Sequence, residues 1–444
     1  MNSDWKIVKL GDVCTIRRGS SPRPIVDYMA PKGMPWVKIS DATESKSRYI
    51  SKTKEFIKPE GISRSVIVNK GDLILSNSGT AGLPKFMEIT ACIHDGWQVF
   101  TELVDIDKEF LYYVLLNIRS KLLHNAYDST MKNLTLDMVR DAQVRLPQIK
   151  EQKRIAGVLS SIDGMIECNQ NVNQTLEQMA QALFKSWFID FEPVKAKIAV
   201  LEAGGSQEDA TLAAMTAISG KDPDSLTIFK REYPEKYAEL RATAELFPPT
   251  MQESELGDIP AGWSSQRMSN IATLHYGKAL KKTERIDGPY PVYGSGGITG
   301  SHNAYLVEGP GIIVGRKGSI GTIYWEDGKF HPIDTVYYVA TKEEIPLSYL
   351  YYLMKTLNLP SMNTDAAVPG LNRDNVYRLE VLKPTQSILN RFDNHIATIR
   401  NSIQKNNNTI VSLVGLRDTL LPKLLSGEIP LPEAEELAKE ADYV

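Results

Sequence analysis

Cysteine is scarce in this chain of 444 residues: there are only three, Cys14, Cys92 and Cys168, and they lie far apart. An odd number of widely spaced cysteines suits neither a disulfide framework nor a site of paired thiolates. The six histidines never fall at the i, i+4 spacing of a metal-binding helix. We therefore expect reduced, structural cysteines and no bound metal.

Long apolar runs are also missing. Although 42% of the residues are hydrophobic, no stretch reaches the roughly eighteen apolar residues that a membrane span needs. The first residues, up to Val13, show neither the apolar core of a secretion signal nor the arginine-rich pattern of an organellar one. We expect a cytoplasmic protein without a membrane partner.

A strong net charge is the third absence, because the chain carries only −3. Residues 1–150 hold 22 Lys and Arg against 17 Asp and Glu (+5), residues 259–385 hold 13 against 11 (+2), and residues 191–258 hold 7 against 13 (−6). Two mildly basic blocks separated by an acidic connector permit binding to DNA. A solvated surface of mixed charge is the alternative.

The sequence contains no recognisable catalytic motif. The glycine-rich stretch at residues 315–322 lacks the Gly-Lys-Ser/Thr ending of a phosphate loop and is better interpreted as a hairpin loop. The glycines at residues 294–300 miss the dinucleotide-binding spacing. A G-x-S-x-G elbow, a nuclease cluster and the Asn/Asp-Pro-Pro-aromatic tetrapeptide of amino-methyltransferases are all missing. We therefore expect no catalytic centre.

The sequence instead repeats itself. Trp5, Leu10 and Gly19 recur 258 residues later as Trp263, Met268 and Gly277. Further blocks recur with shifts of 239 and then 237: residues 73–82 as 312–321, 110–113 as 349–352, and 134–147 as 371–384. Because internal repetition fixes architecture, two copies of one domain are predicted.

Each half has short alternating strands broken by turn residues, a compact helix and then a long helical pattern, which indicates an α+β fold. The expected order is an α+β domain at residues 1–147, a long helix at 148–190, an acidic connector at 191–256, a second α+β domain at 257–384, a second long helix at 385–427, and an acidic C-terminal tail at 428–444.

Both long helices carry a narrow apolar stripe, which is stable only against another helix, so an antiparallel coiled coil is predicted. An ordinary helical core is the alternative. A helix of this length extends on the order of 50 Å, enough to bridge two sites on DNA. The expected core positions are Ile162, Met165, Asn169, Val172, Leu176, Met179, Leu183, Ile396, Ile399, Ile403, Asn406, Ile410, Leu413 and Leu420.

Basic and polar loops in both halves are the candidate contacts to DNA phosphates and base edges. Solvated loop tips are the alternative interpretation. In the first half they are Arg17, Arg18, Ser20, Arg23, Lys38, Ser40, Asn77, Ser78, Lys132 and Asn133. In the second half they are Lys278, Lys281, Lys282, Ser295, Arg316, Lys317, Asn372 and Arg373.

Taken in order, these features resemble the specificity subunit of type I restriction-modification enzymes over essentially the whole chain. The resemblance is carried by the two domain openings, residues 5–13 and 255–263, and by the two long helices with their entries and ends. The second helix entry, residues 385–389, differs from the first, residues 148–152, so the two partner-docking surfaces are not identical.

The resemblance implies two target recognition domains, each reading half of a split sequence in double-stranded DNA, and helices that dock two methyltransferase subunits for adenine N6 methylation. S-adenosylmethionine is expected on those partners and no cofactor on this chain; ATP-dependent restriction subunits would be further partners. Two other interpretations remain open: a non-catalytic scaffold whose domains bind proteins, and an enzyme with an unrecognised site.

Overall fold

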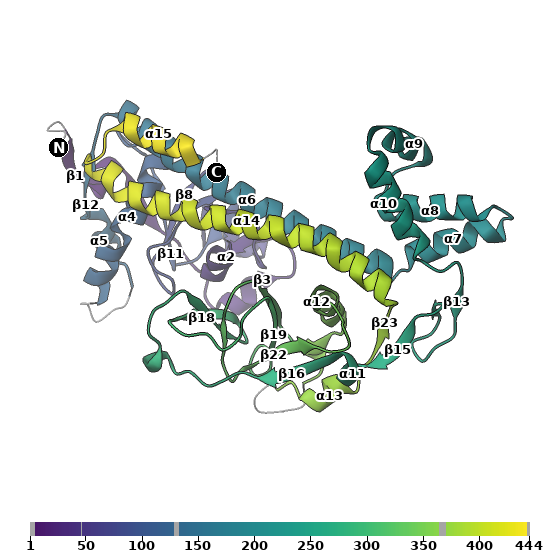
Figure 1. Ribbon diagram of the computed structural model, residues 1–444. Coiled ribbons are helices and arrows are strands. Elements are labelled where there is room, and N and C mark those ends of the chain that lie inside the picture. Colours follow the sequence, from purple (N-terminus) through teal and green to yellow (C-terminus); the bar gives the residue numbers. More distant parts are fainter. Residues whose placement is uncertain (1–4, 46, 128–132, 364–369, 442–444) are drawn as a thin grey trace. The chain divides into compact units, whose positions relative to one another are not determined.

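The computed structural model describes residues 5–45, 47–127, 133–363 and 370–441. The chain forms two compact units. Unit 1 consists of residues 1–171 and 406–444, and unit 2 of residues 172–405. Both units contain mixed sheets together with part of each long helix (Figure 1).

Unit 1 contains two five-stranded sheets, in the orders β2-β11-β8-β9-β5 and β3-β6-β4-β10-β7, and an antiparallel pair of β1 with β12. The strands of the first sheet are β2 (Thr15–Arg18), β11 (Trp97–Thr101), β8 (Leu73–Ser76), β9 (Pro84–Met87) and β5 (Tyr49–Ile50). Those of the second are β3 (Met29–Ala30), β6 (Glu55–Ile57), β4 (Met34–Val37), β10 (Ala91–Ile93) and β7 (Val66–Val68), while β1 is Lys6–Lys9 and β12 is Gln143–Leu146. Short helices connect them: α1 (Leu10–Val13), η1 (Ile25–Tyr28), α2 (Ile39–Glu44), α3 (Pro59–Ile62) and α5 (Leu136–Arg140).

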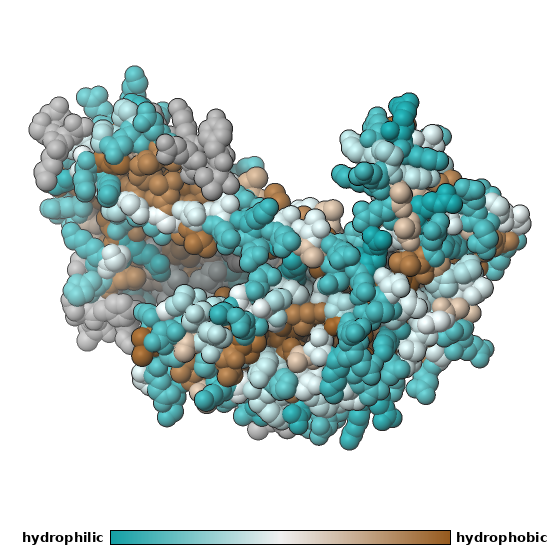
Figure 2. Space-filling view, in the orientation of Figure 1, coloured by the Kyte–Doolittle hydropathy of each residue, from teal (hydrophilic) through white to brown (hydrophobic). Residues whose placement is uncertain are grey.

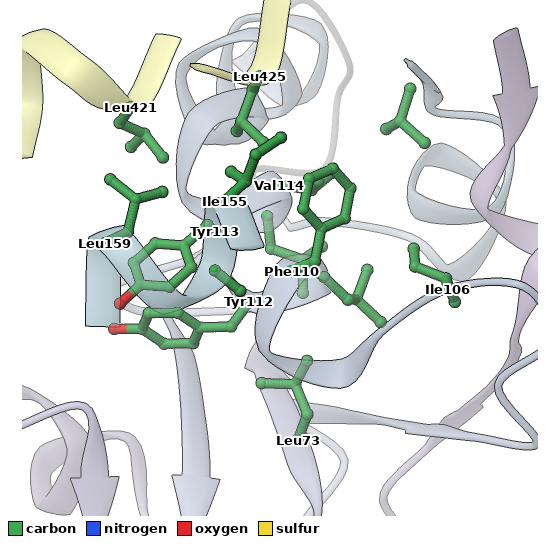
Figure 3. Packing of buried hydrophobic residues seen from close by; sticks show 14 of the residues in the cluster. Leu73, Ile106, Phe110, Tyr112, Tyr113, Val114, Ile155, Leu159, Leu421 and Leu425 are labelled. Carbon is green, nitrogen blue, oxygen red and sulfur yellow. The ribbon is translucent and has the colours of Figure 1, made fainter. Parts of the chain in front are cut away.

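Helix α4 (Lys108–Tyr127) joins this sheet to the long helices. Its Phe110 and Tyr113 are fully buried in one apolar cluster with Leu73 of β8. The same cluster contains Ile155 of α6 (Ile149–Phe188) and Leu421 of α14 (Gln386–Ser426), as Figure 3 shows. The α+β part of unit 1 and its part of the helix pair therefore share one hydrophobic core.

Unit 2 has a four-stranded sheet in the order β16-β22-β19-β20, a three-stranded sheet β18-β17-β21, and the pairs β15–β23 and β13–β14. The strands are β13 (Met251–Gln252), β14 (Ile259–Pro260), β15 (Ser264–Arg267), β16 (Ala272–Tyr276), β17 (Tyr290–Gly294), β18 (Gly297–His302), β19 (Gly311–Gly315), β20 (Ile323–Glu326), β21 (His331–Pro332), β22 (Val336–Thr341) and β23 (Glu380–Lys383). The helices of this α+β part are α11 (Met268–Ile271), η2 (Lys282–Glu284), α12 (Leu347–Thr356), η3 (Leu359–Ser361) and α13 (Arg373–Tyr377).

The two units repeat one topology. The order β16-β22-β19-β20 has the same antiparallel pairings as β2-β11-β8-β9. The opening strand of each half pairs with the strand that precedes the long helix, β1 with β12 and β15 with β23. The predicted α+β fold with two copies of one domain is confirmed.

The long helices α6 and α14 run antiparallel within each unit. In unit 1, Asp163 of α6 meets Arg417 of α14 at 3.0 Å; in unit 2, Glu177 of α6 meets Arg400 of α14 at 3.3 Å. Residue numbers that rise along one helix and fall along the other define an antiparallel pair. This part of the coiled-coil prediction is confirmed.

The expected register along α6 is wrong in its second half. Val172 and Met179 are 43% and 56% exposed. Fully or nearly buried positions of α6 include Ile155, Leu159, Ile162 and Ile166 in unit 1 and Ala180, Phe184 and Trp187 in unit 2, with a spacing of three or four residues within each group. The three- and four-residue spacing of apolar side chains favoured Val172 and Met179, but Ala180 is the residue that lies in the buried cluster of unit 2.

The other expected core positions are at least partly covered. Five of them are buried: Ile162, Ile396, Ile403, Leu413 and Leu420. Another seven are half-buried: Met165, Asn169, Leu176, Leu183, Ile399, Asn406 and Ile410. The Asn169 amide donates to the carbonyl oxygen of Met165 at 2.9 Å, within its own helix.

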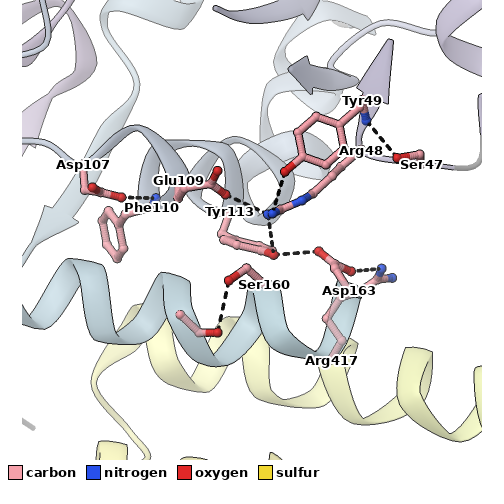
Figure 4. Close-up of polar contacts among 11 residues, drawn as sticks. Ser47, Arg48, Tyr49, Asp107, Glu109, Phe110, Tyr113, Ser160, Asp163 and Arg417 are labelled. Carbon is pink, nitrogen blue, oxygen red and sulfur yellow. Dashed lines mark hydrogen bonds and ion pairs between the residues drawn. The ribbon is translucent and has the colours of Figure 1, made fainter. Parts of the chain in front are cut away.

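A polar network secures α4 to both long helices in unit 1 (Figure 4). The Tyr113 hydroxyl donates to the Asp163 carboxylate at 2.7 Å, and Arg417 donates to the same carboxylate. Arg48 donates to Glu109 at 2.7 Å and to the Tyr113 hydroxyl at 3.3 Å. Burial together with the Asp163 charge raises the pKa of Tyr113, so this hydroxyl stays protonated and can donate.

The acidic connector is a helical module, not an irregular linker. It comprises α7 (Glu192–Glu202), α8 (Gln207–Ser219), α9 (Pro223–Glu232) and α10 (Pro234–Glu245). A small core of Ala214, Met215, Leu226 and Ala244 holds α8, α9 and α10 together. The surface of α9 and α10 in view is largely hydrophilic (Figure 2).

The expected C-terminal tail also contains a helix, α15 (Leu431–Ala441). Leu431 and Ala434 of α15 are buried in the main core of unit 1. Val194 and Lys197 of α7, 237 residues earlier, are buried in unit 2. The repeat therefore extends one helix beyond the expected boundaries. Among the described residues, no helix has the length and apolarity needed to cross a membrane.

Candidate nucleic-acid interface

Three predicted side chains of unit 1 converge on the segment His94–Gly96, which links β10 to β11. The Asn77 amide and the Arg18 guanidinium both donate to the main-chain oxygen of Asp95, at 3.0 and 2.7 Å. Arg23 lies 3.4 Å from the Asp95 carboxylate. Loops that are separated in sequence thus meet at one acidic residue.

Asp95 and His94 were not predicted. The Ser21 hydroxyl donates to Asp95 at 2.6 Å and, with the charge of Arg23, holds the pKa of this carboxyl below its usual value. His94 accepts a hydrogen bond from the Gly96 amide at Nδ1, and burial lowers its pKa. Asp95 recurs 239 residues later as Asp334, and this recurrence was the available signal for it, whereas the position of His94 is taken by Ile333.

Asn77 differs from the expectation of a surface contact, because only 2% of the residue is exposed. Its amide is used to hold Asp95, and its main-chain oxygen accepts from the Leu134 amide at 2.9 Å. Asn77 is therefore part of the scaffold beneath the loops, with its side-chain nitrogen and its main-chain oxygen used inside the fold and its side-chain oxygen buried without a partner.

The remaining predicted residues of unit 1 lie apart from Asp95 or are tied to other groups. Arg17 pairs with Glu102 at 3.6 Å, and Lys38 pairs with Glu55. Ser20 donates to the carbonyl oxygen of Arg64 at 3.0 Å. The Ser78 hydroxyl lies beside Gly96, and Ser40 and Asn133 are exposed. Lys132 lies outside the described residues.

In unit 2, four predicted residues line one hollow of about 250 Å³: Arg316, Lys317, Asn372 and Arg373. Tyr276 and Tyr337, which were not predicted, form part of the same lining. The Arg316 guanidinium carbon lies 4.8 Å from the centre of the Tyr276 ring, and that of Arg373 lies 5.1 Å from it. One aromatic ring therefore holds two cations, an arrangement that restricts the guanidinium groups while leaving their charge.

The other predicted residues of unit 2 do not line this hollow. Lys278 follows β16 and donates its main-chain amide to Pro332, while Lys281 lies 3.8 Å from Glu284. Lys282 begins η2. The carbonyl oxygen of Ser295 accepts from the Thr322 hydroxyl at 2.7 Å. Within the hollow, Asn372 uses its side-chain oxygen to cap α13.

The two halves build these loops on the same hydrogen-bonded scaffold. Arg316 stands 239 residues after Asn77, and it donates to the main-chain oxygen of Asp334 at 2.9 Å as Asn77 donates to that of Asp95. The Leu371 amide donates to the Arg316 oxygen at 2.8 Å, as Leu134 donates to Asn77.

Two glycines, Gly19 and Gly277, also hold equivalent positions in the two halves. A Cβ on Gly19 would lie 2.1 Å from the His94 oxygen, and one on Gly277 would lie 2.1 Å from the Ile333 oxygen. Both contacts are too close for any side chain, so the main chain that follows β2 in unit 1 directly approaches the loop before β11, and the main chain that follows β16 in unit 2 directly approaches the loop before β22. The two halves share this main-chain arrangement, and the side chains mounted on it differ.

The charges differ between these scaffolds. In unit 1, carboxylates pair with Arg17, Arg18, Arg23 and Lys38. Within the described part of the chain, by contrast, Arg316, Lys317 and Arg373 form no ion pair. These three cations and the carboxylate of Asp374 line the polar hollow, and the excess of positive charge favours an anionic or electron-rich ligand.

The family comparison matches both halves. The model of the type I restriction modification DNA specificity domain matches residues 2–178 and 260–410, well over half of the chain. The matched regions contain both sets of loops described above.

Named relatives align over almost the full length. The HindI specificity subunit of Haemophilus influenzae is 29% identical over 469 aligned positions, which cover 96% of this chain and 100% of that protein. The MjaIX specificity subunit of Methanocaldococcus jannaschii is 23% identical, with 97% and 94% covered. The solved S subunit of a type I system from M. genitalium covers 96% of both chains at 16% identity, with a TM-score of 0.48. From the family match, this chain belongs to the family of type I restriction-modification DNA specificity proteins and carries its specificity domain twice.

Proposed function

We propose that this chain is the DNA-recognition subunit of a type I restriction-modification complex, and that each α+β domain reads one half of a split DNA target. The observation that carries the proposal is the duplicated loop scaffold, in which Asn77 and Arg316 hold equivalent main-chain positions with different side chains. Sequence is read by side chains at base edges, so one scaffold with two sets of side chains suits two different half-sites.

The chemistry is assigned to partner subunits. Methyltransferase subunits that dock on the long helices would bind S-adenosylmethionine and methylate adenine N6 after extruding the base. In support, this chain lacks the tetrapeptide that holds an extruded adenine. The subunit itself is proposed to be non-catalytic, and ATP-dependent restriction subunits would join the same assembly.

The test is to co-express the chain with the methyltransferase encoded beside its gene, in a host that lacks adenine methylation, and to map methylated adenines by single-molecule sequencing. A split motif with a fixed gap supports the proposal. A stable complex that methylates no specific sequence would instead favour a scaffold that binds proteins.

Charge reversal separates phosphate contacts from base contacts. We expect Lys281→Glu with Lys282→Glu to weaken binding of the complex to all sequences alike and to reduce its salt dependence. A double variant of equal charge change on the exposed surface of α9, Lys230→Glu with Arg231→Glu, is the matched control. Equal effects of the two variants would show that the loop after β16 makes no phosphate contact.

The long helices are proposed to set the gap between the half-sites. Inserting one heptad into both helices lengthens the pair by roughly 10 Å, which corresponds to about three base pairs. The tolerated gap should grow by that amount. An unchanged gap in a complex that still methylates would contradict this role.

A further inference from the structure

The hollow in unit 2 contains an arginine whose guanidinium is held in place but not fully used. Arg373 lies over two rings, 5.1 Å from the centre of Tyr276 and 5.7 Å from that of Tyr377. Its Nε is buried and has no hydrogen-bond partner. Buried donors are normally satisfied, so Arg373, which also lines the polar hollow, has unused hydrogen-bonding capacity for a ligand bound there.

The two neighbouring cations of the hollow have other roles. Arg316 donates from Nη1 to the Asp334 oxygen and stacks on Tyr276 and Tyr337, so it serves the scaffold. Lys317 is exposed at the rim, with its main-chain amide on Thr335. An ammonium in that place is a point charge suited to a phosphate.

On this basis we infer that Arg373 reads a guanine in the half-site bound by the second domain, donating to O6 and N7 at its major-groove edge. This inference rests on the proposed function. Guanine presents two adjacent acceptors there, and the planar fork of arginine matches them. Stacking on Tyr276 and Tyr377 would hold the fork in orientation before DNA arrives, which lowers the entropy lost on binding.

The corresponding place in unit 1 is chemically different. Leu136 occupies the position 237 residues before Arg373, and Gln98 stands where Tyr337 does. Gln98 is fully buried and donates to the Leu134 oxygen at 3.1 Å, as the Tyr337 hydroxyl donates to Leu371 at 3.0 Å. The first half-site therefore has no counterpart of the Arg373 contact and is an internal control.

The first experiment maps methylation by the complex carrying Arg373→Ala, Arg373→Lys or Lys317→Ala. The unmodified complex should require guanine at one or more positions of the second half-site. Arg373→Ala should reduce discrimination at one of them by roughly 5- to 150-fold and leave the first half-site unchanged. Arg373→Lys should also lose discrimination, because it keeps the charge but not the fork. Lys317→Ala should weaken methylation of all sequences alike.

Base analogues then identify the atoms. In binding measurements on the full complex, inosine at the affected position keeps O6 and N7 and should bind nearly as guanine does. The analogue 7-deazaguanine lacks N7 and should bind more weakly. That penalty should disappear in Arg373→Ala.

The outcomes separate this inference from the proposed function. A split motif without any guanine in its second half, an unchanged motif in Arg373→Ala, or a uniform loss across all sequences would overturn the guanine contact alone. The absence of any motif from the unmodified complex would remove the proposed function and this inference with it. Co-purification with the methyltransferase and an unchanged melting profile show that each variant is folded.

Discussion

The carboxylate of Asp163 in α6 accepts a hydrogen bond of 3.0 Å from Arg417 of α14. The Asp163 side chain is 12% exposed and that of Arg417 25% exposed. Because Tyr113 donates to the same carboxylate, one residue connects a recognition domain to both long helices in unit 1. The rigidity of this junction depends on a charge that is largely hidden from water.

Breaking this pair should destabilise unit 1. Removing one partner of a fully buried pair costs about 3–5 kcal/mol; because Arg417 is partly exposed, we expect about 1–3 kcal/mol for Arg417→Met. The free energy of unfolding is measured in urea, with hydrogen exchange of the α4 amides as the probe. Arg241→Met breaks exposed pairs with Glu208 and Glu245 and is the control. An equal loss of stability in both variants would show that the Asp163–Arg417 pair contributes no more than an exposed pair.

The close approach at Gly277 should tolerate no side chain. An alanine Cβ would lie 2.1 Å from the Ile333 oxygen, so the strand or the recognition loop must move. We expect Gly277→Ala to lower the stability of unit 2 by at least about 1–3 kcal/mol. Gly296→Ala, which meets nothing within 4 Å, should behave like the parent. Thermal melting of both variants tests this, and a parent-like Gly277→Ala would show that the approach is looser.

Adjacent positions test the corrected helix register. Ala180 is completely buried whereas Met179 is 56% exposed. Ala180→Gln places a long polar side chain in the seam and should lower the melting temperature by several degrees, about 1–3 kcal/mol. Met179→Gln should have little effect. If Met179→Gln lowered the melting temperature more than Ala180→Gln, the register expected from the sequence would be the correct one.

Stability should fall in mildly acidic solution because of His94. Burial lowers its pKa below the unfolded value of 6.5, so the unfolded chain binds more protons in this range. The contribution of neutral His94 is complete above pH of about 6.5 and is lost as the pH falls through its lower folded value. Melting of the parent between pH 7.5 and 5.5 should therefore decline more steeply than that of His94→Gln. Parallel pH profiles would exclude His94 as the cause.

The architecture could be predicted well from the sequence because duplication is visible without geometry. Trp5 and Trp263 mark the two openings, and the long apolar stripes predicted antiparallel helices. The seam was misplaced along α6 because Val172 and Met179 continue the apolar spacing of the preceding turns, although both are exposed and the small Ala180 beside Met179 is buried. Hydrophobicity and size would place Met179 inside, but the packing of the helices buries the smaller Ala180 instead.

The recognition loops were predicted less completely. Polar loop residues were identified by type, yet type does not distinguish a side chain that faces solvent from one that holds the scaffold, as Asn77 does. Tyr276 was missed because its partner Arg373 stands nearly a hundred residues away and meets it only in the fold. The DNA contacts themselves remain predictions.

The discontinuity of unit 1 has a consequence for synthesis. Its core needs Leu413 and Leu420, which follow residue 171 by more than two hundred residues. At translation rates of about 5–20 residues per second, this interval lasts roughly 10–50 s. During that time the apolar stripe of α6 beside the first domain has no partner from α14. The nascent protein thus exposes an unpaired hydrophobic seam until the last helices emerge.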